Sequence, residues 1–257
     1  MTLGIIGGTG SQPLARIGQD WRPATDSAST PYGPASAVPE VASTDAGEIL
    51  LLPRHGKPPG FAPHIVNYRA NIWLMKELGA DAVVATYAVG AIAPNIRNAD
   101  LLVPHQVIDY TWGRRHTYVE PGEIRHVDFT EPFDGRIRSG LISAGEGCDL
   151  TGRLHRSGIY GCVQGPRLET AAEIDRMERD GCTVVGMTAM PETALAKELG
   201  IPYAGVCLVV NAAAGRGDGP ITGAEIEAAL KSAVVDLGSL LDTFLSSAVK
   251  ALPDSPR

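Results

Sequence analysis

The feature that most constrains the fold is an almost uninterrupted apolar run, Asp81-Ala82-Val83-Val84-Ala85-Thr86-Tyr87-Ala88-Val89-Gly90. A strand that is buried on both faces carries such a run, because neither face meets water. Shorter apolar runs recur along the chain and alternate with segments whose apolar residues repeat at helical spacing. This alternation predicts an α/β sandwich, with helices packed on a central sheet.

The predicted strands and helices cover most of the chain. Strands are predicted at 3–7, 48–53, 81–90, 100–108, 158–163, 182–185 and 203–210, and helices at 68–78, 134–144, 169–180, 192–199 and 226–248. Short edge strands are expected within 18–47, and residues 112–128 are expected to be irregular. We find no internal repeat and no linker, so the sequence predicts one domain over 1–257.

Composition excludes several classes of function. The chain has a formal net charge of −7 and no basic run, which argues against a nucleic-acid partner but allows a small anion to bind. Its four cysteines lack metal-ligand spacing, so we expect no bound metal and reduced thiols typical of the cytoplasm. No apolar stretch is long enough for a membrane span, and the first residues do not resemble a signal peptide.

Polar residues collect where the predicted strands end, which is where ligands bind in open α/β sheets. These positions are Thr9, Arg54 with His55, the 86–90 strand end, Glu169, Met187 with Thr188, and Asn211. The convergence of six segments is a stronger signal than any one of them. It predicts a single ligand site at this edge of the sheet.

Three of these segments point to an anion. Arg54 offers a planar fork of donors, and we expect His55 to add one more. Backbone N–H groups at a helix start bind anions, and the hydroxyl groups of Thr9 and Thr188 add donors. The glycines around Thr9 could instead form a plain tight turn.

A nicotinamide site is the alternative for the glycine loop, because Gly4, Gly7 and Gly10 match the spacing of a dinucleotide fingerprint. That fingerprint needs a helix directly after the loop and an acidic residue on the next strand. Here Pro13 follows the loop and Asp26 lies in a predicted loop, so we favour a turn that cups one phosphate.

The motifs resemble the nucleoside phosphorylase family, which includes purine nucleoside phosphorylase and methylthioadenosine phosphorylase. The resemblance runs from Gly4 to about Leu241 and is carried by 7–10, 54–56, 66–73, 186–188 and 191–192. It implies a three-layer sandwich with a mixed central sheet, assembled as trimers or hexamers. It also implies an attack of inorganic phosphate on the anomeric carbon of a purine nucleoside, without metal or cofactor.

The resemblance assigns roles to individual residues. Those implied for phosphate are Thr9, Arg54, His55, the N–H of Ala88, and Thr188. Those implied for the nucleoside are Leu168 on the purine face, Glu169 and Asn211 at the base, Met187 at the ribose, Gly223 near the 5′ group, and His126 lent by a neighbouring subunit. Asn211, Arg54 and His55 are the expected catalytic residues.

Departures from the family pattern narrow the substrate. Tyr87 replaces the Thr or Asn usual beside the phosphate-binding alanine, which predicts a remodelled rim. Methylthioadenosine phosphorylases carry Asp-x-Asp where this chain has Asn211 and Ala213, and Asn211 with Glu169 resembles the 6-oxopurine-selective branch. Gly223 stands where purine nucleoside phosphorylases place a histidine that binds the 5′-hydroxyl, so we expect a 5′-methylthio group there.

The leading expectation is therefore phosphorolysis of 5′-methylthioinosine. Methylthioadenosine phosphorylase and a general 6-oxopurine nucleoside phosphorylase remain the alternative enzymes. A non-catalytic nucleoside sensor on the same fold is the alternative from another class.

Overall fold

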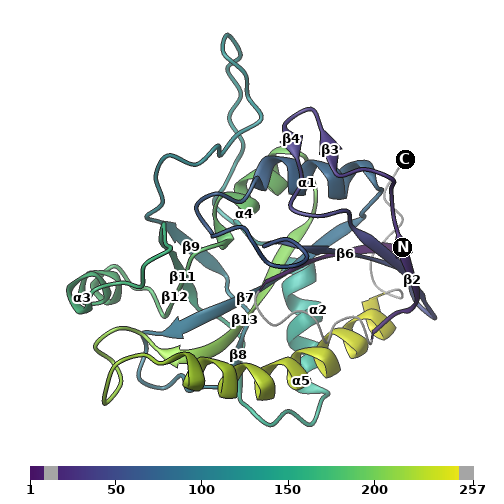
Figure 1. The fold of residues 1–257 in the computed structure, drawn as a ribbon. Helices are drawn as coiled ribbons and strands as arrows, with labels where there is room; N and C mark the ends of the chain where they lie inside the picture. The colour runs from purple at the N-terminus through teal and green to yellow at the C-terminus, as the bar shows by residue number, and fades with distance from the viewer. Residues whose placement is uncertain (9–16, 249–257) are drawn as a thin grey trace.

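The computed structural model describes residues 1–8 and 17–248, and its central element is the predicted apolar strand, β7 (Ala82–Ala91). β1 (Thr2–Gly7) and β13 (Tyr203–Ala212) pair with β7 in parallel, one on each edge. Figure 1 shows β7 and β13 crossing the middle of the molecule. The prediction of a central strand from its apolar run is confirmed.

The other elements follow the predicted alternation. The remaining strands are β2 (Gln19–Pro23), β3 (Ser29–Thr30), β4 (Gly33–Pro34), β5 (Glu40–Thr44), β6 (Gly47–Pro53), β8 (Leu101–Leu102), β9 (Gln106–Asp109), β10 (Leu154–His155), β11 (Ile159–Cys162) and β12 (Val184–Gly186). The helices are α1 (Tyr68–Glu77), α2 (Gly135–Glu146), α3 (Ala171–Arg179), α4 (Ala189–Glu198) and α5 (Gly223–Ala248).

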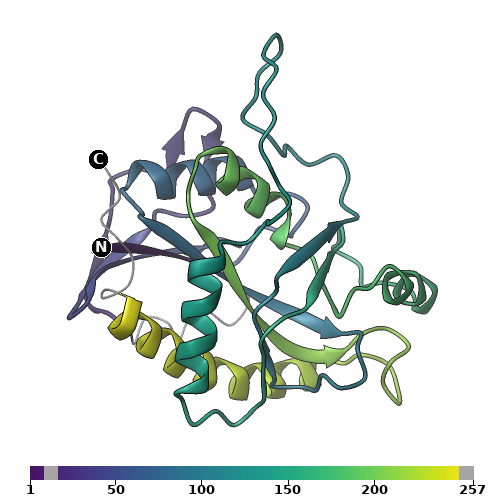
Figure 2. The ribbon, with the colours of Figure 1, turned by 180° about the vertical axis from the view of Figure 1, so that it is seen from behind.

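The sheet is mixed and forms the middle of three layers, as expected. Its main path runs β10-β8-β13-β7-β1-β6-β5-β2. Alternate strand residues face opposite sides, so Ile6 packs with α1 and α4 while Ile5 packs with α2 and α5. Figures 1 and 2 show these two helix pairs on opposite faces, with α3 set apart. Within the described residues no helix is long and apolar enough to cross a membrane.

The sheet splits along one edge of β7. β13 occupies one edge of β7 from Val83 to Ala91, so β1 and β12 must share the other. β1 pairs there only as far as Ala85, and β12 pairs only with Gly90 and Ala91. Among the described residues, 86–89 have no strand partner on this edge, so their backbone can face a ligand.

Several predicted boundaries differ from the structure: α4 and α5 each begin three residues before their predicted starts, at Ala189 and Gly223. The strand predicted over 100–108 is two strands, β8 and β9, because Pro104 between them has no N–H for a ladder. The helix predicted from Glu169 begins at Ala171, because Thr170 and Glu173 form a capping box. Glu169 therefore lies in the loop before the helix and not on its first turn.

Candidate active site

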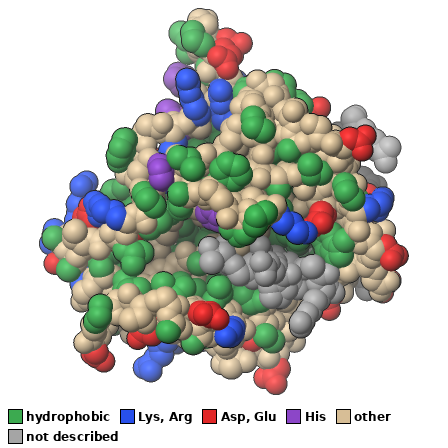
Figure 3. Space-filling view, in the orientation of Figure 1, with side chains coloured by type: hydrophobic (Ala, Val, Ile, Leu, Met, Phe, Trp, Pro, Cys, Tyr) green, Lys and Arg blue, Asp and Glu red, His purple; other side chains and the backbone are tan. Residues whose placement is uncertain are grey.

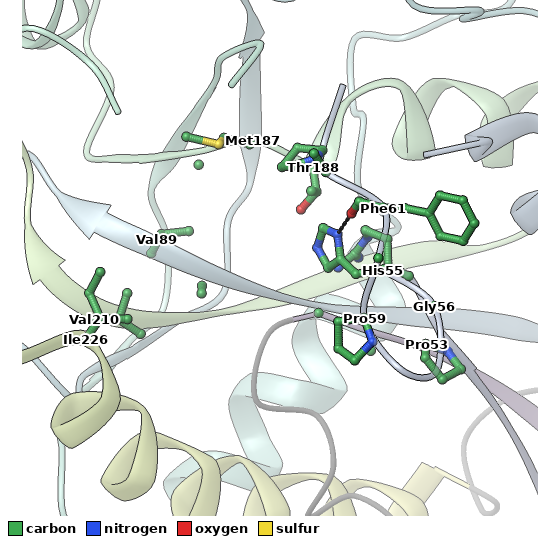
Figure 4. A pocket seen from close by; sticks show the side chains of 18 of the residues that line it. Pro53, His55, Gly56, Pro59, Phe61, Val89, Met187, Thr188, Val210 and Ile226 are labelled. Atoms are coloured by element: carbon green, nitrogen blue, oxygen red, sulfur yellow. Dashed lines mark hydrogen bonds between the residues drawn. The ribbon is translucent and has the colours of Figure 1, made fainter. Parts of the chain in front are cut away.

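A cavity of about 1000 Å³ opens where the sheet splits. It is lined by most of the residues predicted from the sequence: Arg54, His55, Ala88, Leu168, Glu169, Met187, Thr188 and Asn211. Residues 56–63, between β6 and α1, form a further wall. Figure 3 shows a hollow on this face, and Figure 4 shows side chains from β6, the β12–α4 turn and α5 around it. The fold thus brings segments distant in sequence to one site.

Arg54 follows β6 directly and is fully buried. Its Nε and Nη2 donate to the two carboxylate oxygens of Glu192, at 2.5 and 2.9 Å, and Nη1 donates to the backbone oxygen of Thr86 at 2.9 Å. A guanidinium has five N–H groups, so two remain on Nη1 and Nη2. Because Arg54 lines the cavity, we expect these two N–H groups to bind an anion there.

Glu192 is the main residue to which the sequence analysis assigned no role. Burial is the largest single influence and lowers the pKa of Arg54, but the charge of Glu192, its hydrogen bonds and the nearby Tyr203 and Tyr87 together raise that pKa above its ordinary value. The guanidinium is therefore charged at any physiological pH. The signal in the sequence was an acidic side chain within the apolar segment Ala189–Ala196, where a carboxylate needs a buried partner.

Gly8, at the start of the glycine loop, lies close to this guanidinium. A Cβ atom at Gly8 would lie 2.8 Å from Nη1 of Arg54 and 2.7 Å from the backbone oxygen of Thr86, which is too close for any side chain. The Gly8 N–H donates to Oγ1 of Thr86 at 3.0 Å. Thr9, predicted to donate to phosphate, lies outside the described residues.

His55 differs from its predicted role as a donor. Its Nδ1 lies 2.7 Å from the backbone oxygen of Phe61, and a carbonyl can only accept, so Nδ1 carries the proton (Figure 4). Burial and then the nearby Arg54 lower the pKa of His55, which favours the neutral ring. Neutral His55 therefore presents Nε2 as an acceptor, which suits the hydroxyl group of hydrogen phosphate.

Thr188 and Ala88 line the same cavity as Arg54. Thr188 occupies the N-cap position of α4 but makes no side-chain capping bond, and Figure 4 shows its hydroxyl group toward His55. Ala88 lies on the unpaired edge of β7 and lines the cavity. Both positions can offer a donor to the anion that Arg54 would hold, and their contacts with phosphate stay predictions.

Asn211 and Glu169 bring amide and carboxylate groups to the same cavity. Asn211 Nδ2 donates to the backbone oxygen of Ala212 at 2.6 Å, which leaves one N–H and the side-chain carbonyl free. Asn211 follows a register shift in β13, which turns the end of the strand. Glu169 precedes α3, and Leu168 beside it is exposed. The roles of these three residues toward a base stay predictions.

The fall of kcat/KM at acid pH should reflect protonation of Glu169. Burial raises the pKa of Glu169, so the carboxylate form is lost at a higher pH than for an exposed glutamate, whose pKa is about 4.3. If the carboxylate accepts N1–H of a 6-oxopurine, kcat/KM falls as the pH drops through this raised pKa. The measurement is kcat/KM against pH for wild type and Glu169→Gln, whose amide oxygen still accepts but does not titrate.

The comparison of the two proteins controls for other titrating groups, because the substitution Glu169→Gln leaves both His55 and phosphate in place. An acid limb of the same position and steepness in Glu169→Gln would contradict the assignment.

Arg114 is a second residue absent from the sequence-based site. Its Nη1 donates to the backbone oxygen atoms of Met187 and Met190, at 2.8 and 2.5 Å. Its Nη2 donates to those of Val163 and Gln164, at 3.3 and 2.8 Å. Arg114 thereby ties the β12–α4 turn to the end of β11, the two segments that lead to the cavity-lining residues. Arg114 lies in the segment 112–128, which the sequence predicted to be irregular, so no role was predicted for it.

Two predicted substrate contacts lie outside the cavity of their own chain. Gly223 is exposed at the start of α5 and does not line the cavity, whereas Ile226, one turn later, does. Ile226 is therefore the residue of this helix start that faces the cavity, and the predicted place of Gly223 near the 5′ group stays a prediction. His126 is exposed in the segment between β9 and α2, which projects from the body in Figure 1.

The predicted remodelling of the rim by Tyr87 was wrong. Tyr87 is 1% exposed and packs in the core beneath the guanidinium of Arg54, whose Cζ lies 5.3 Å from the ring centre. It does not line the cavity. In the described chain no group of three or more His, Cys, Asp or Glu residues could hold a metal ion.

Comparisons with known proteins agree on one family. The family described as the phosphorylase superfamily matches residues 2–246. A protein from Pseudomonas syringae pv. tomato named as a probable S-methyl-5′-thioinosine phosphorylase is 46% identical, over 95% of this chain and 98% of its own. The 6-oxopurine nucleoside phosphorylase of Pyrococcus furiosus is 37% identical, over 93% and 90%.

The solved structures point the same way. A methylthioadenosine phosphorylase from Schistosoma mansoni in complex with adenine superposes with a TM-score of 0.89 at 28% identity, covering 98% of this chain and 93% of that one.

Proposed function

This chain belongs to the phosphorylase superfamily, and from that premise we propose that it cleaves a 6-oxopurine nucleoside with phosphate, S-methyl-5′-thioinosine being the preferred substrate. The products are hypoxanthine and 5-methylthioribose 1-phosphate. The observation that carries the proposal is that one cavity is lined both by donors suited to an anion, Arg54 and Thr188, and by groups suited to a purine base, Glu169 and Asn211. The names of the relatives at 37–46% identity support it.

The reaction needs charge placed at two points. A phosphate oxygen forms a bond to the anomeric carbon while the bond to purine N9 breaks, and its electron pair passes to the purine. The sugar resembles an oxocarbenium ion at the transition state. Arg54 and Thr188 hold the phosphate, and the free N–H of Asn211 donates to N7 or O6 of the departing base.

Proton balance closes on the substrates themselves. Hydrogen phosphate loses its proton in becoming the sugar phosphate ester, and the purine gains one in leaving. His55 Nε2 accepts the hydrogen bond from the phosphate hydroxyl and so orients that proton. We propose that no metal or organic cofactor takes part, phosphate being a co-substrate.

The decisive experiment is a panel of nucleosides with inorganic phosphate: methylthioinosine, methylthioadenosine, inosine, guanosine and adenosine. Phosphate-dependent release of hypoxanthine from methylthioinosine supports the proposal. Faster cleavage of methylthioadenosine would support the alternative favoured by the Schistosoma mansoni structures, and binding without turnover would favour a sensor.

The 5′ group should separate methylthioinosine from inosine by at least about tenfold in kcat/KM, or about 1.4 kcal/mol. Ile226 and Val210 give the cavity an apolar wall on the side of α5 (Figure 4). On this wall the described residues of the same chain offer a 5′-hydroxyl no hydrogen-bond partner, and burying it unpaired costs about 1–3 kcal/mol. The alternative is that His126 of a neighbouring subunit binds a 5′-hydroxyl. A buried methylthio group gains about 0.8 kcal/mol per carbon-sized unit.

Ile226→His should narrow this gap by supplying a hydrogen-bonding group at the wall. Gly223→His is the matched control, because Gly223 lies on the same helix but is exposed. Equal efficiency on the two nucleosides in wild type would leave a general 6-oxopurine nucleoside phosphorylase.

We propose further that the enzyme is a homo-oligomer, a trimer or hexamer, in which His126 reaches the site of a neighbouring subunit. The segment that carries it exposes 90% of Ile124, an apolar surface that a partner would cover. We place the enzyme in the cytoplasm, since its four cysteines are free thiols. Light scattering measures the oligomeric state.

A further inference from the structure

Two buried tyrosines close a ring of contacts around the Arg54–Glu192 pair. The Tyr203 hydroxyl donates to Oε2 of Glu192 at 2.8 Å, and the hydroxyl groups of Tyr87 and Tyr203 lie 2.5 Å apart. The aromatic ring of Tyr87 packs against the guanidinium of Arg54, with 5.3 Å between the ring centre and Cζ of Arg54. Arg54, Glu192, Tyr203 and Tyr87 are each at most 2% exposed.

The direction of the hydrogen bonds is fixed by counting protons. A phenol has one O–H, and Tyr203 gives its proton to Glu192. Tyr87 must therefore donate to Tyr203. The chain runs Tyr87 to Tyr203 to the carboxylate, and each bond polarises the next. Tyr87 thus acts on Arg54 twice, through its ring and through this relay to Glu192.

Arg54 needs such support because only two of its N–H groups remain for a ligand. Their direction is set by the plane of the guanidinium, which Glu192 holds at one edge and the ring of Tyr87 supports on one face. A rotation of Glu192 would turn both free N–H groups away from the anion. We propose that Tyr87 is a positioning residue that fixes the Arg54 guanidinium for phosphate binding.

This proposal rests on the proposed function, because it takes phosphate as the ligand of Arg54. Tyr87 does not line the cavity, so it acts through the residues that it contacts. Besides Arg54 and Tyr203 these include Tyr160, which packs against the Tyr87 ring at a centroid distance of 5.2 Å, a contact that Tyr87→Phe retains. The competing interpretation is that Tyr87 merely fills the core. A purely structural role would change the stability of the protein without changing its use of phosphate.

The test compares Tyr87→Phe, Tyr203→Phe and the double variant with Tyr118→Phe. Tyr118 is a matched control, since it is also buried and donates to a backbone oxygen, that of Arg69 at 2.8 Å, away from the cavity. We would measure KM for phosphate, KM for methylthioinosine, kcat, and thermal unfolding with and without inorganic phosphate.

Tyr87→Phe and Tyr203→Phe should each raise KM for phosphate about three- to tenfold and leave KM for the nucleoside within about twofold of the wild-type value. Tyr203→Phe leaves the hydroxyl of Tyr87 without a partner, so adding Tyr87→Phe should cost nothing more or should partly restore phosphate binding. Tyr118→Phe should lower the unfolding temperature without changing KM for phosphate. Tyr87→Leu, which also removes the ring, should weaken phosphate binding further than Tyr87→Phe.

An unchanged KM for phosphate in Tyr87→Phe and Tyr203→Phe would overturn the proposal, as would independent, multiplicative effects in the double variant. Failure of the proposed function looks different, because wild type would then cleave no nucleoside in the panel. In that case the stabilisation of each variant by inorganic phosphate still reports the position of Arg54 without turnover. Equal stabilisation of wild type and Tyr203→Phe would then reject the positioning role.

Discussion

Replacing Arg54 with alanine should lower kcat/KM for phosphate by about a thousandfold or more, because the charged donor to the anion is lost. It should also destabilise the fold by about 3–5 kcal/mol, because the carboxylate of Glu192 is left buried without its partner. The measurements are phosphate-dependent turnover and the free energy of unfolding in urea.

The two effects can be separated with a second variant. Arg54→Ala with Glu192→Ala removes both charges, so much of the stability should return while the use of phosphate stays impaired. Thr188→Ala should impair phosphate use more mildly than Arg54→Ala, since a neutral donor is lost. Unchanged phosphate dependence in Arg54→Ala would move the anion site elsewhere.

Asn211→Asp should lower the ratio of kcat/KM for methylthioinosine to kcat/KM for methylthioadenosine by about a hundredfold, or about 2.7 kcal/mol. In wild type, Asn211 gives one N–H to the backbone oxygen of Ala212 and keeps the other for the base. A carboxyl group has no N–H, and an oxygen facing Ala212 favours its protonated form. Hypoxanthine release should slow and adenine release should gain, as measured by kcat/KM for the two nucleosides.

Glu169 supplies the other half of this discrimination. A 6-aminopurine has no N1–H, so its N1 lone pair would face the carboxylate, which is an unfavourable pairing in a buried site. Glu169→Gln therefore serves as the control, since it should relax the preference without reversing it. A wild type that cleaves methylthioadenosine faster than methylthioinosine would show the base assignment to be wrong.

The chain by itself determined the layout of the site. Apolar runs specify strands through local periodicity, and the residue after each strand is then fixed by sequence position alone. This is why the sequence alone places Arg54, His55, Thr188 and Asn211 at or near strand ends, and all four line the cavity. The resemblance carried by the same segments predicted the family that the comparisons report.

What the tertiary structure decided are relations between segments distant in sequence. Glu192 lies 138 positions after Arg54, and no local sequence pattern indicates that the two residues form a buried ion pair. The tautomer of His55 follows from the oxygen of Phe61, which only the folded loop brings within hydrogen-bonding distance. That Ile226 and not Gly223 lines the cavity depends on how α5 is rotated against the sheet, and that rotation is set by packing across the whole interface. Sequence patterns report what each segment prefers, whereas donors, acceptors and charges acquire their roles from the partners that the fold places within a few ångströms.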